Sequence, residues 1–243
     1  MDLNKQIYSA GKALSLIDRA AFRVRREIYD ILDRQVSLNS ISSILDIGVT
    51  ADQQCISSNV FENLYPYPDR ITVLSDQDAK WMEETYPGLK FVFGDGRYLP
   101  FADNSFDLVY SSAVIEHVGS FENQVRMVAE CVRVSKNYIF LTTPNKWHPL
   151  EFHTALPFVH WLPKSFHRRF LSLMGYDSLA FEQQLNLLST KEIKKICVEI
   201  GLQSYKIISP RFLGFRSNLL MFADLSVQKS FKSKTQLVEV FKN

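Results

Sequence analysis

Acidic residues and glycines stand directly after short apolar runs in this sequence. Asp46 and Gly48 end the run ILDIG, Asp95 and Gly96 follow FVFG, and Ser111 lies at the end of FDLVYSS. The carboxyl ends of parallel strands meet at one edge of an α/β sheet, and ligands bind at that edge. A glycine at such an end lets the backbone come close to a ligand. We therefore expect these residues to share one site.

Carboxylates at two further positions fit the polar groups of a nucleoside. Asp76 and Asp78 follow the second apolar run, where an ionised carboxylate accepts two hydrogen bonds from a ribose diol. One of the two is expected to cap the next helix instead. Asp95 and the amide of Gly96 can meet an exocyclic amine and a ring nitrogen, as adenine presents them. Neither GxGxxG nor GxxxxGK[ST] occurs, so a ligand without phosphates is expected.

Short apolar runs alternate with helical patterns from residue 44 to residue 143, which predicts a parallel sheet with helices on both faces. The predicted strands are 44–48, 71–75, 90–93, 106–111 and 137–143, and the predicted helices lie near 57–65, 78–86 and 120–135. The capping box STKE at 189–192 starts another helix. Residues 203–209 and 218–225 are predicted to form an antiparallel hairpin.

The segments around this core set the domain organisation. An amphipathic helical segment over 1–40 precedes a domain at 41–225, and a polar tail follows at 226–243. Within the domain, residues 145–188 break the alternation and are interpreted as a helical and aromatic insertion, or lid, over the site. Four arginines of the first segment could attract an anion but are interpreted as a solvated face; these are Arg19, Arg23, Arg25 and Arg26.

Composition narrows the class of protein. A net charge of +2 over 243 residues gives no field strong enough to indicate a nucleic-acid partner. The three cysteines, Cys55, Cys131 and Cys197, are far apart, which disfavours a disulfide framework and favours a reducing cytoplasm. No apolar run of about 18 residues occurs, so we expect a protein that does not span a membrane. The oligomeric state is not readable from the sequence.

The segment LPFADNSFDLVYSSAVIEHV, residues 99–118, resembles the class I S-adenosylmethionine-dependent methyltransferases, in the methyltransferase type 11 branch. The resemblance covers roughly residues 40–145. It implies a Rossmann-like, seven-stranded, mostly parallel sheet with an antiparallel C-terminal hairpin, and S-adenosyl-L-methionine as cofactor. It also implies cofactor-binding positions at Asp46, Gly48, Asp76 for the ribose, and Asp95 and Gly96 for adenine. Ser111 and Ser112 match the family's fourth strand end, beside the methionine part.

The glycine motif of that family is degenerate here, because Thr50 and Asp52 replace its second and third glycines. Two accounts are open. Thr50, Asp52, Gln53 and Gln54 supply side-chain hydrogen bonds to the cofactor, or the cofactor no longer enters. The first is favoured, because a buried Asp95 without a ligand would cost several kcal/mol. The second describes a non-catalytic protein that binds a partner or a membrane through its aromatic insertion, and a cavity filled by Gln53 or Gln54 would favour it.

The resemblance places His117 near the transferred methyl group, where it is a candidate general base for a hydroxyl acceptor. The alternative is a histidine held by the backbone. We expect a small-molecule acceptor, or a glycan- or lipid-linked one, methylated at oxygen. Residues 156–176 mix large apolar groups with basic ones, a composition that suits peripheral membrane contact. A metal site from His148, Glu151 and His153 is disfavoured by its spacing, and a nicotinamide-dependent oxidoreductase by the missing glycines.

Overall fold

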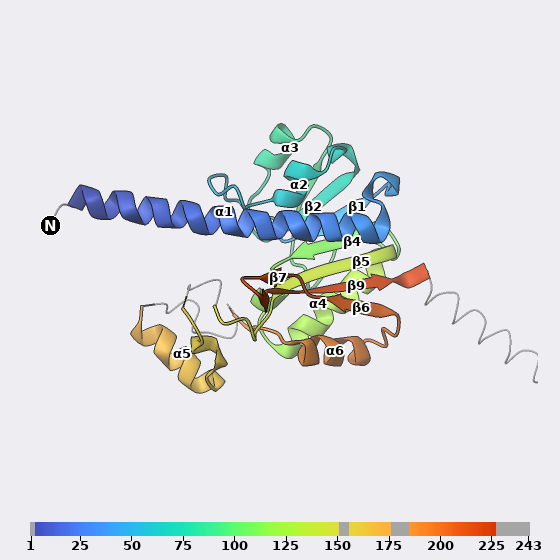
Figure 1. The fold of residues 1–243 in the computed structure, drawn as a ribbon. Helices are drawn as coiled ribbons and strands as arrows, with labels where there is room; N and C mark the ends of the chain where they lie inside the picture. Colours follow the sequence, from blue (N-terminus) through green and yellow to red (C-terminus); the bar gives the residue numbers. More distant parts are fainter. Residues whose placement is uncertain (1–2, 151–155, 176–184, 227–243) are drawn as a thin grey trace, which may run out of the picture.

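A computed structural model describes residues 3–150, 156–175 and 185–226 (Figure 1). Its centre is a seven-stranded sheet in the order β3-β2-β1-β4-β5-β9-β6. The first five strands are parallel, and β9 pairs antiparallel with both β5 and β6. The strands are β1 (Ile44–Ile47), β2 (Ile71–Ser75), β3 (Lys90–Phe93), β4 (Phe106–Ser112), β5 (Ser135–Pro144), β6 (Tyr205–Ile208) and β9 (Asn218–Asp224). The expected sheet is confirmed.

Helices cover both faces of the sheet, and each face has its own apolar core. One core packs Ile28, Phe61 and Met82 from three helices against Tyr110 and Phe140 of the sheet. Those helices are α1 (Leu3–Val36), α2 (Val60–Leu64) and α3 (Trp81–Thr85). The other core packs α4 (Phe121–Val134) and α6 (Thr190–Glu199) on the opposite face. Central parallel strands buried on both sides account for the continuous apolar runs in the sequence.

Local sequence signals explain where the helices begin. The Ser120 side chain accepts a hydrogen bond from the amide of Asn123 at the start of α4. Ser189 and Glu192 form the expected capping box of α6. The amphipathic helical segment expected over 1–40 contains the single helix α1, which Figure 1 shows lying across the sheet.

The insertion begins and ends at neighbouring positions. Asn145 and Leu188 form an isolated parallel bridge, so the chain leaves and re-enters the sheet region at one place. Between them lie a 3-10 turn, η4 (Val159–Trp161), and α5 (Lys164–Leu173), which Figure 1 shows apart from the helices covering the sheet. No helix within the described residues is both long and apolar enough to cross a bilayer.

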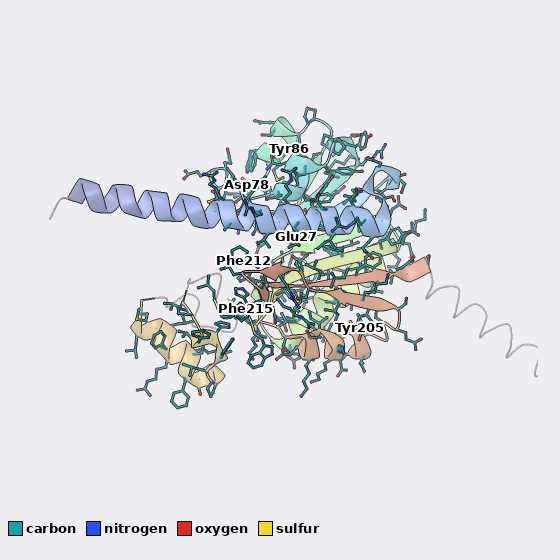
Figure 2. The ribbon with its side chains drawn as sticks, viewed as in Figure 1. Glu27, Asp78, Tyr86, Tyr205, Phe212 and Phe215 are labelled. Atoms are coloured by element: carbon teal, nitrogen blue, oxygen red, sulfur yellow. The ribbon has the colours of Figure 1, made fainter. Side chains whose placement is uncertain are left out.

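The connection between β6 and β9 is more ordered than the loop expected there. It contains a two-stranded ribbon of β7 (Arg211–Phe212) and β8 (Phe215–Arg216), which is separate from the main sheet. Figure 2 labels Phe212 and Phe215 of this ribbon on the side toward the insertion. Both rings contact the imidazole of His148, with centroids 6.3 and 6.2 Å away. The ribbon therefore supports the first residues of the insertion.

Candidate functional site

A cavity of about 740 Å³ lies at the carboxyl ends of β1, β2, β3 and β4. Its volume is within the range of pockets that enclose a drug-sized ligand. Most of the residues expected at the site line it, whereas Ser111, Asp52, Gln53 and Gln54 do not. The lining members of that set are Asp46, Gly48, Thr50, Asp76, Asp95, Gly96 and His117.

Ser111 is oriented away from this cavity. Its hydroxyl is buried and donates to the carbonyl oxygen of Ile47 at 2.8 Å, which joins β4 to β1. The next residue, Ser112, lines the cavity instead. The expected strand end is therefore present, but the serine that faces the cavity is one residue further along.

Gly48 stands where only a glycine fits. Its backbone has φ +90°, and an added Cβ would lie 2.2 Å from Cγ2 of Val114. Both the positive φ and the contact disfavour any side chain. The end of β1 and the segment after β4 therefore approach each other more closely here than any other residue type allows.

Side chains hold the loop in which the expected glycines are missing. The amide of Thr50 donates to Oδ1 of Asn59 at 3.0 Å, and Nδ2 of Asn59 donates back to the Thr50 carbonyl at 2.9 Å. The amide of Ala51 donates to Oε1 of Gln77 at 3.1 Å. Thr50, Asn59 and Gln77 all line the cavity, so this wall is fixed by carboxamide groups.

Asp52, Gln53 and Gln54 do not line the cavity. The Asp52 carboxylate accepts hydrogen bonds within the loop, from the amides of Gln54 and Cys55 and the hydroxyl of Ser58. These bonds, the Gln54 amide first, lower the pKa of Asp52 to about 2. Gln53 and Gln54 are exposed, so neither fills the cavity. Of the four side chains expected to replace the glycines, only Thr50 faces the cavity.

Two side chains of helix α1 form hydrogen bonds with the end of this loop. Asp18 accepts hydrogen bonds from the amides of Ile56 and Ser57, each at 2.9 Å. Arg25 donates to the carbonyl of Ser57 and lines the cavity. The interpretation of Arg25 as part of a solvated face is therefore wrong.

Asp95 is neither buried nor unpaired, so the argument that burial would make it costly without a ligand is wrong. Its side chain is 37% exposed, and both of its oxygens accept hydrogen bonds from the guanidinium of Arg97. This pairing lowers the pKa of Asp95 below its usual value. The ionised carboxylate lies at the cavity wall and, with four lone-pair directions, can accept a further donor.

The two acidic residues after β2 have different positions. Asp76 is exposed and lines the cavity. Asp78 is outside the cavity lining, and its Oδ1 accepts a hydrogen bond from the amide of Lys80 at 3.2 Å, just before α3. Asp76 is therefore the carboxylate available to a ligand, while Asp78 stabilises the turn.

A buried carboxyl pair forms the inner wall of the cavity. Asp46, at the end of β1, and Glu62, in α2, are both buried and both line the cavity. Burial raises the pKa of each, and the neighbouring acid raises that of Asp46 further.

His117 lies at the mouth of the cavity, in the 3-10 turn η3 (Ile115–His117) after β4. Its Nε2 is 4.0 Å from Oε1 of Glu116, which is fully buried. The other oxygen of Glu116 accepts a hydrogen bond from the hydroxyl of Thr143 at 2.9 Å. The Thr143 hydroxyl thus fixes the carboxyl group beside the imidazole.

Two of the three residues weighed for a metal site, Glu151 and His153, lie outside the described residues. The third, His148, has its Nδ1 within hydrogen-bonding distance of the backbone of Leu150. Within the described part of the chain, no three metal-ligating side chains come together.

The polar lining residues that sequence reasoning missed include Arg25, Asn59, Glu62 and Gln77. Two had a signal that could have been used. Arg25 stands four residues after Ala21 and three before Ile28, so it interrupts an apolar helical stripe, and Glu62 interrupts the short helix after β1. A charged residue on the inner face of a helix needs a polar partner, which here is the cavity. Asn59 and Gln77 carried no comparable signal.

Comparison with known proteins agrees with this fold. Residues 55–139 match the family described as "Methyltransferase domain". No curated protein sequence matches the chain. Similar solved structures include a methyltransferase of Thermotoga maritima, described as a possible histamine N-methyltransferase, with 14% identity and a TM-score of 0.53. That alignment covers 90% of this chain and 96% of the other.

Two further similar structures contain S-adenosylhomocysteine. N-methyltransferase NodS from Bradyrhizobium japonicum has 13% identity and a TM-score of 0.50, covering 82% of this chain and 86% of its own. Magnesium protoporphyrin IX methyltransferase from Synechocystis has 12% identity and a TM-score of 0.52, covering 84% and 83%. At these identities the structures show a shared fold, which is that of S-adenosylmethionine-dependent methyltransferases. Residues 55–139 are in addition similar to a methyltransferase domain.

The close approach at Gly48 predicts a specific loss of stability. Gly48→Ala adds both a strained backbone and a clash with Val114, so it should reduce the free energy of unfolding by about 2–5 kcal/mol. Gly201→Ala is the matched control, because Gly201 also has a positive φ but no atom within 4 Å of an added Cβ. Urea unfolding measures both. Val114→Ala should restore part of the loss in the Gly48→Ala background, and equal losses in the two glycine variants would contradict the clash.

Proposed function

We propose that this enzyme binds S-adenosylmethionine across the ends of β1 to β4 and transfers its methyl group to a hydroxyl oxygen of a small-molecule, glycan-linked or lipid-linked acceptor. The observation that carries the proposal is the cavity, which gathers seven of the expected site residues at the ends of four strands. The bound cofactor supplies an electrophilic methyl group on a sulfonium centre.

Residues of three strand ends would hold the adenosine part. Asp76 is in position for the ribose hydroxyls, and Asp95 with the backbone of Gly96 for the adenine edge. An added Cβ at Gly96 would lie 2.9 Å from Cγ2 of Ile47, which leaves room for backbone only. Gly48, Thr50 and the wall behind them would contact the methionine part.

His117 would accept the proton of the acceptor hydroxyl as the new carbon–oxygen bond forms. Glu116, fixed by Thr143, would stabilise the resulting imidazolium. Direct displacement needs mainly positioning, so the residues that hold the two reactants account for most of the acceleration.

The surface of the insertion favours a lipid-linked acceptor and peripheral membrane contact. Phe166 and Leu173 are exposed and seven residues apart in α5, so they lie on one side of this helix, together with exposed Arg169. Phe166 is 67% and Leu173 80% exposed. A helix that combines an exposed apolar stripe with a cation suits an anionic lipid surface.

The non-catalytic alternative would be favoured by a cavity filled with the side chain of Gln53 or Gln54. Both residues are exposed and outside the cavity, so this support is missing. The cytoplasmic location expected from the cysteines is part of the proposal, and all three occur as free thiols.

Cofactor binding is tested with two neighbouring carboxylates. Asp76→Ala should weaken S-adenosylhomocysteine binding by roughly 10- to 100-fold, because it removes charge-assisted hydrogen bonds to the ribose. Asp78→Ala should leave the affinity unchanged, since Asp78 lies outside the cavity. Isothermal titration calorimetry measures both. No heat with the unaltered enzyme, or equal effects of the two variants, would overturn the placement.

The role of His117 is tested by separating binding from transfer. His117→Ala should slow methyl transfer by about 10²- to 10⁴-fold while changing S-adenosylhomocysteine affinity little, because the ring serves the acceptor. Tritium-labelled S-adenosylmethionine incubated with lipid, glycan and water-soluble fractions of cells reports the transfer. A variant with undiminished transfer would contradict the general-base role.

Membrane contact is tested by flotation with vesicles. The protein should float with phosphatidylcholine vesicles that contain phosphatidylglycerol and much less with phosphatidylcholine alone. The double change Phe166→Ser with Leu173→Ser should abolish flotation. Val198→Ser is the matched control on α6, because Val198 is 75% exposed but outside the insertion. Flotation that survives the double change would rule out this surface.

A further inference from the structure

The turn after β4, residues 115–120, forms one wall of the cavity. Four consecutive residues of this turn line the cavity, namely His117, Val118, Gly119 and Ser120. The 3-10 helix η3 within it has only three residues, so regular secondary structure holds little of its backbone. The position of this wall therefore depends on the hydrogen bonds that its carbonyl groups accept from other parts of the chain.

Two buried carboxamide residues supply such hydrogen bonds. Gln124 of α4 is 2% exposed, and its Nε2 donates to the carbonyl oxygen of Ile115 at 3.2 Å. Asn186 is 6% exposed, and its Nδ2 donates to the carbonyl oxygen of Gly119 at 2.8 Å. The backbone amide of Asn186 donates to the carbonyl oxygen of Glu116 at 2.7 Å. The turn is thus held at three of its carbonyl groups.

The two carboxamide residues are also joined to each other, because Nε2 of Gln124 donates to the backbone carbonyl oxygen of Asn186 at 2.9 Å. Gln124 belongs to the helix that directly follows the turn. Asn186 comes 67 residues after Gly119, at the end of the insertion over 145–188. Asn186 therefore connects the cavity wall that carries His117 to the segment expected to cover the acceptor.

The start of the insertion is held in a different way. Nδ2 of Asn145 donates to the carbonyl oxygen of Arg216 at 3.0 Å, and its backbone amide donates to that of Ser217 at 2.8 Å. Both acceptors lie in the connection between β6 and β9, and not in the turn after β4. The two ends of the insertion can therefore be altered separately.

We propose that Asn186 is a positioning residue for methyl transfer. It holds the turn after β4 so that the imidazole of His117 faces the acceptor, and it makes this position depend on how the end of the insertion is seated. Asn186 is outside the cavity lining, so it acts through the turn and not by contact with either reactant. This inference rests on the proposed role of His117 and extends it to a residue that the sequence does not mark.

A double-mutant cycle on transfer of the tritium-labelled methyl group tests the proposal. Asn186→Ala should slow transfer by about 10- to 100-fold, because the turn loses its side-chain donor at Gly119 and the imidazole is misplaced. In the His117→Ala background the same change should have little further effect, since no imidazole remains to be positioned. Changes that act independently would instead multiply.

Two further variants separate positioning from general damage. Asn186→Leu keeps the approximate size of the side chain without a donor, so it should slow transfer as much as Asn186→Ala does. Asn145→Ala is the matched control, because it loosens the other end of the insertion and should leave transfer unchanged. Thermal unfolding checks that each variant is folded.

Amide hydrogen exchange provides a measurement that needs no acceptor. Peptides that cover residues 115–120 should exchange faster in Asn186→Ala than in the unaltered enzyme, because the turn opens more easily. The same peptides should exchange at the original rate in Asn145→Ala. Unchanged exchange in Asn186→Ala would overturn the proposal even where no cell fraction accepts the label.

The outcomes separate this inference from the function beneath it. Undiminished transfer in Asn186→Ala, equal losses in Asn186→Ala and Asn145→Ala, or an equal effect of Asn186→Ala with and without His117 would overturn the positioning role alone. Full transfer by His117→Ala would overturn the general-base role on which it rests. Failure of the unaltered enzyme to bind S-adenosylhomocysteine would overturn the proposed function itself.

Discussion

The structure depends on one close approach, where the backbone of Gly48 lies against the side chain of Val114. This contact brings the end of β1 next to the segment that follows β4, and it sets the distance between the two halves of the cavity. On one side lie the carboxyl pair and the carboxamide-fixed loop, and on the other lies His117. With any larger residue at position 48, the two sides would have to move apart.

The loop after Gly48 shows how a wall usually built from glycines can be built from side chains. Glycines allow a ligand to approach the backbone, but they leave the backbone free to move. Here Asn59 and Gln77 take the hydrogen-bonding positions on Thr50 and Ala51, and Asp18 and Asp52 hold the residues behind them. These hydrogen bonds hold the wall in place without a ligand. The side chains also occupy space in which glycines would let a ligand approach the backbone.

Strand positions could be predicted from the sequence because parallel strands give short apolar runs, which are buried in β1, β2, β4 and β5 and partly exposed in the edge strand β3. The expected site residues follow from those positions, since each strand end sends its next residues to the same edge. The partners within the site could not be predicted in this way. The pairing of Asp95 with Arg97 depends on a local turn, and the meeting of Arg25 with Glu62 depends on how α1 packs across α2. Ser111 and Ser112 show a further limit of prediction from sequence. A predicted strand end gives the region of the site, but it does not give which of two neighbouring side chains lines the cavity.

The bridge between Asn145 and Leu188 has a consequence for how this enzyme can diversify. Two hydrogen bonds of the buried Asn186 hold the end of the insertion next to η3. The backbone amide of Asn186 donates to the carbonyl oxygen of Glu116 at 2.7 Å, and its side-chain amide donates to the carbonyl oxygen of Gly119 at 2.8 Å. The insertion is therefore a segment whose two ends lie next to each other beside the sheet. Exchange of that segment for one of another length or composition would therefore leave the strand ends that line the cavity in place.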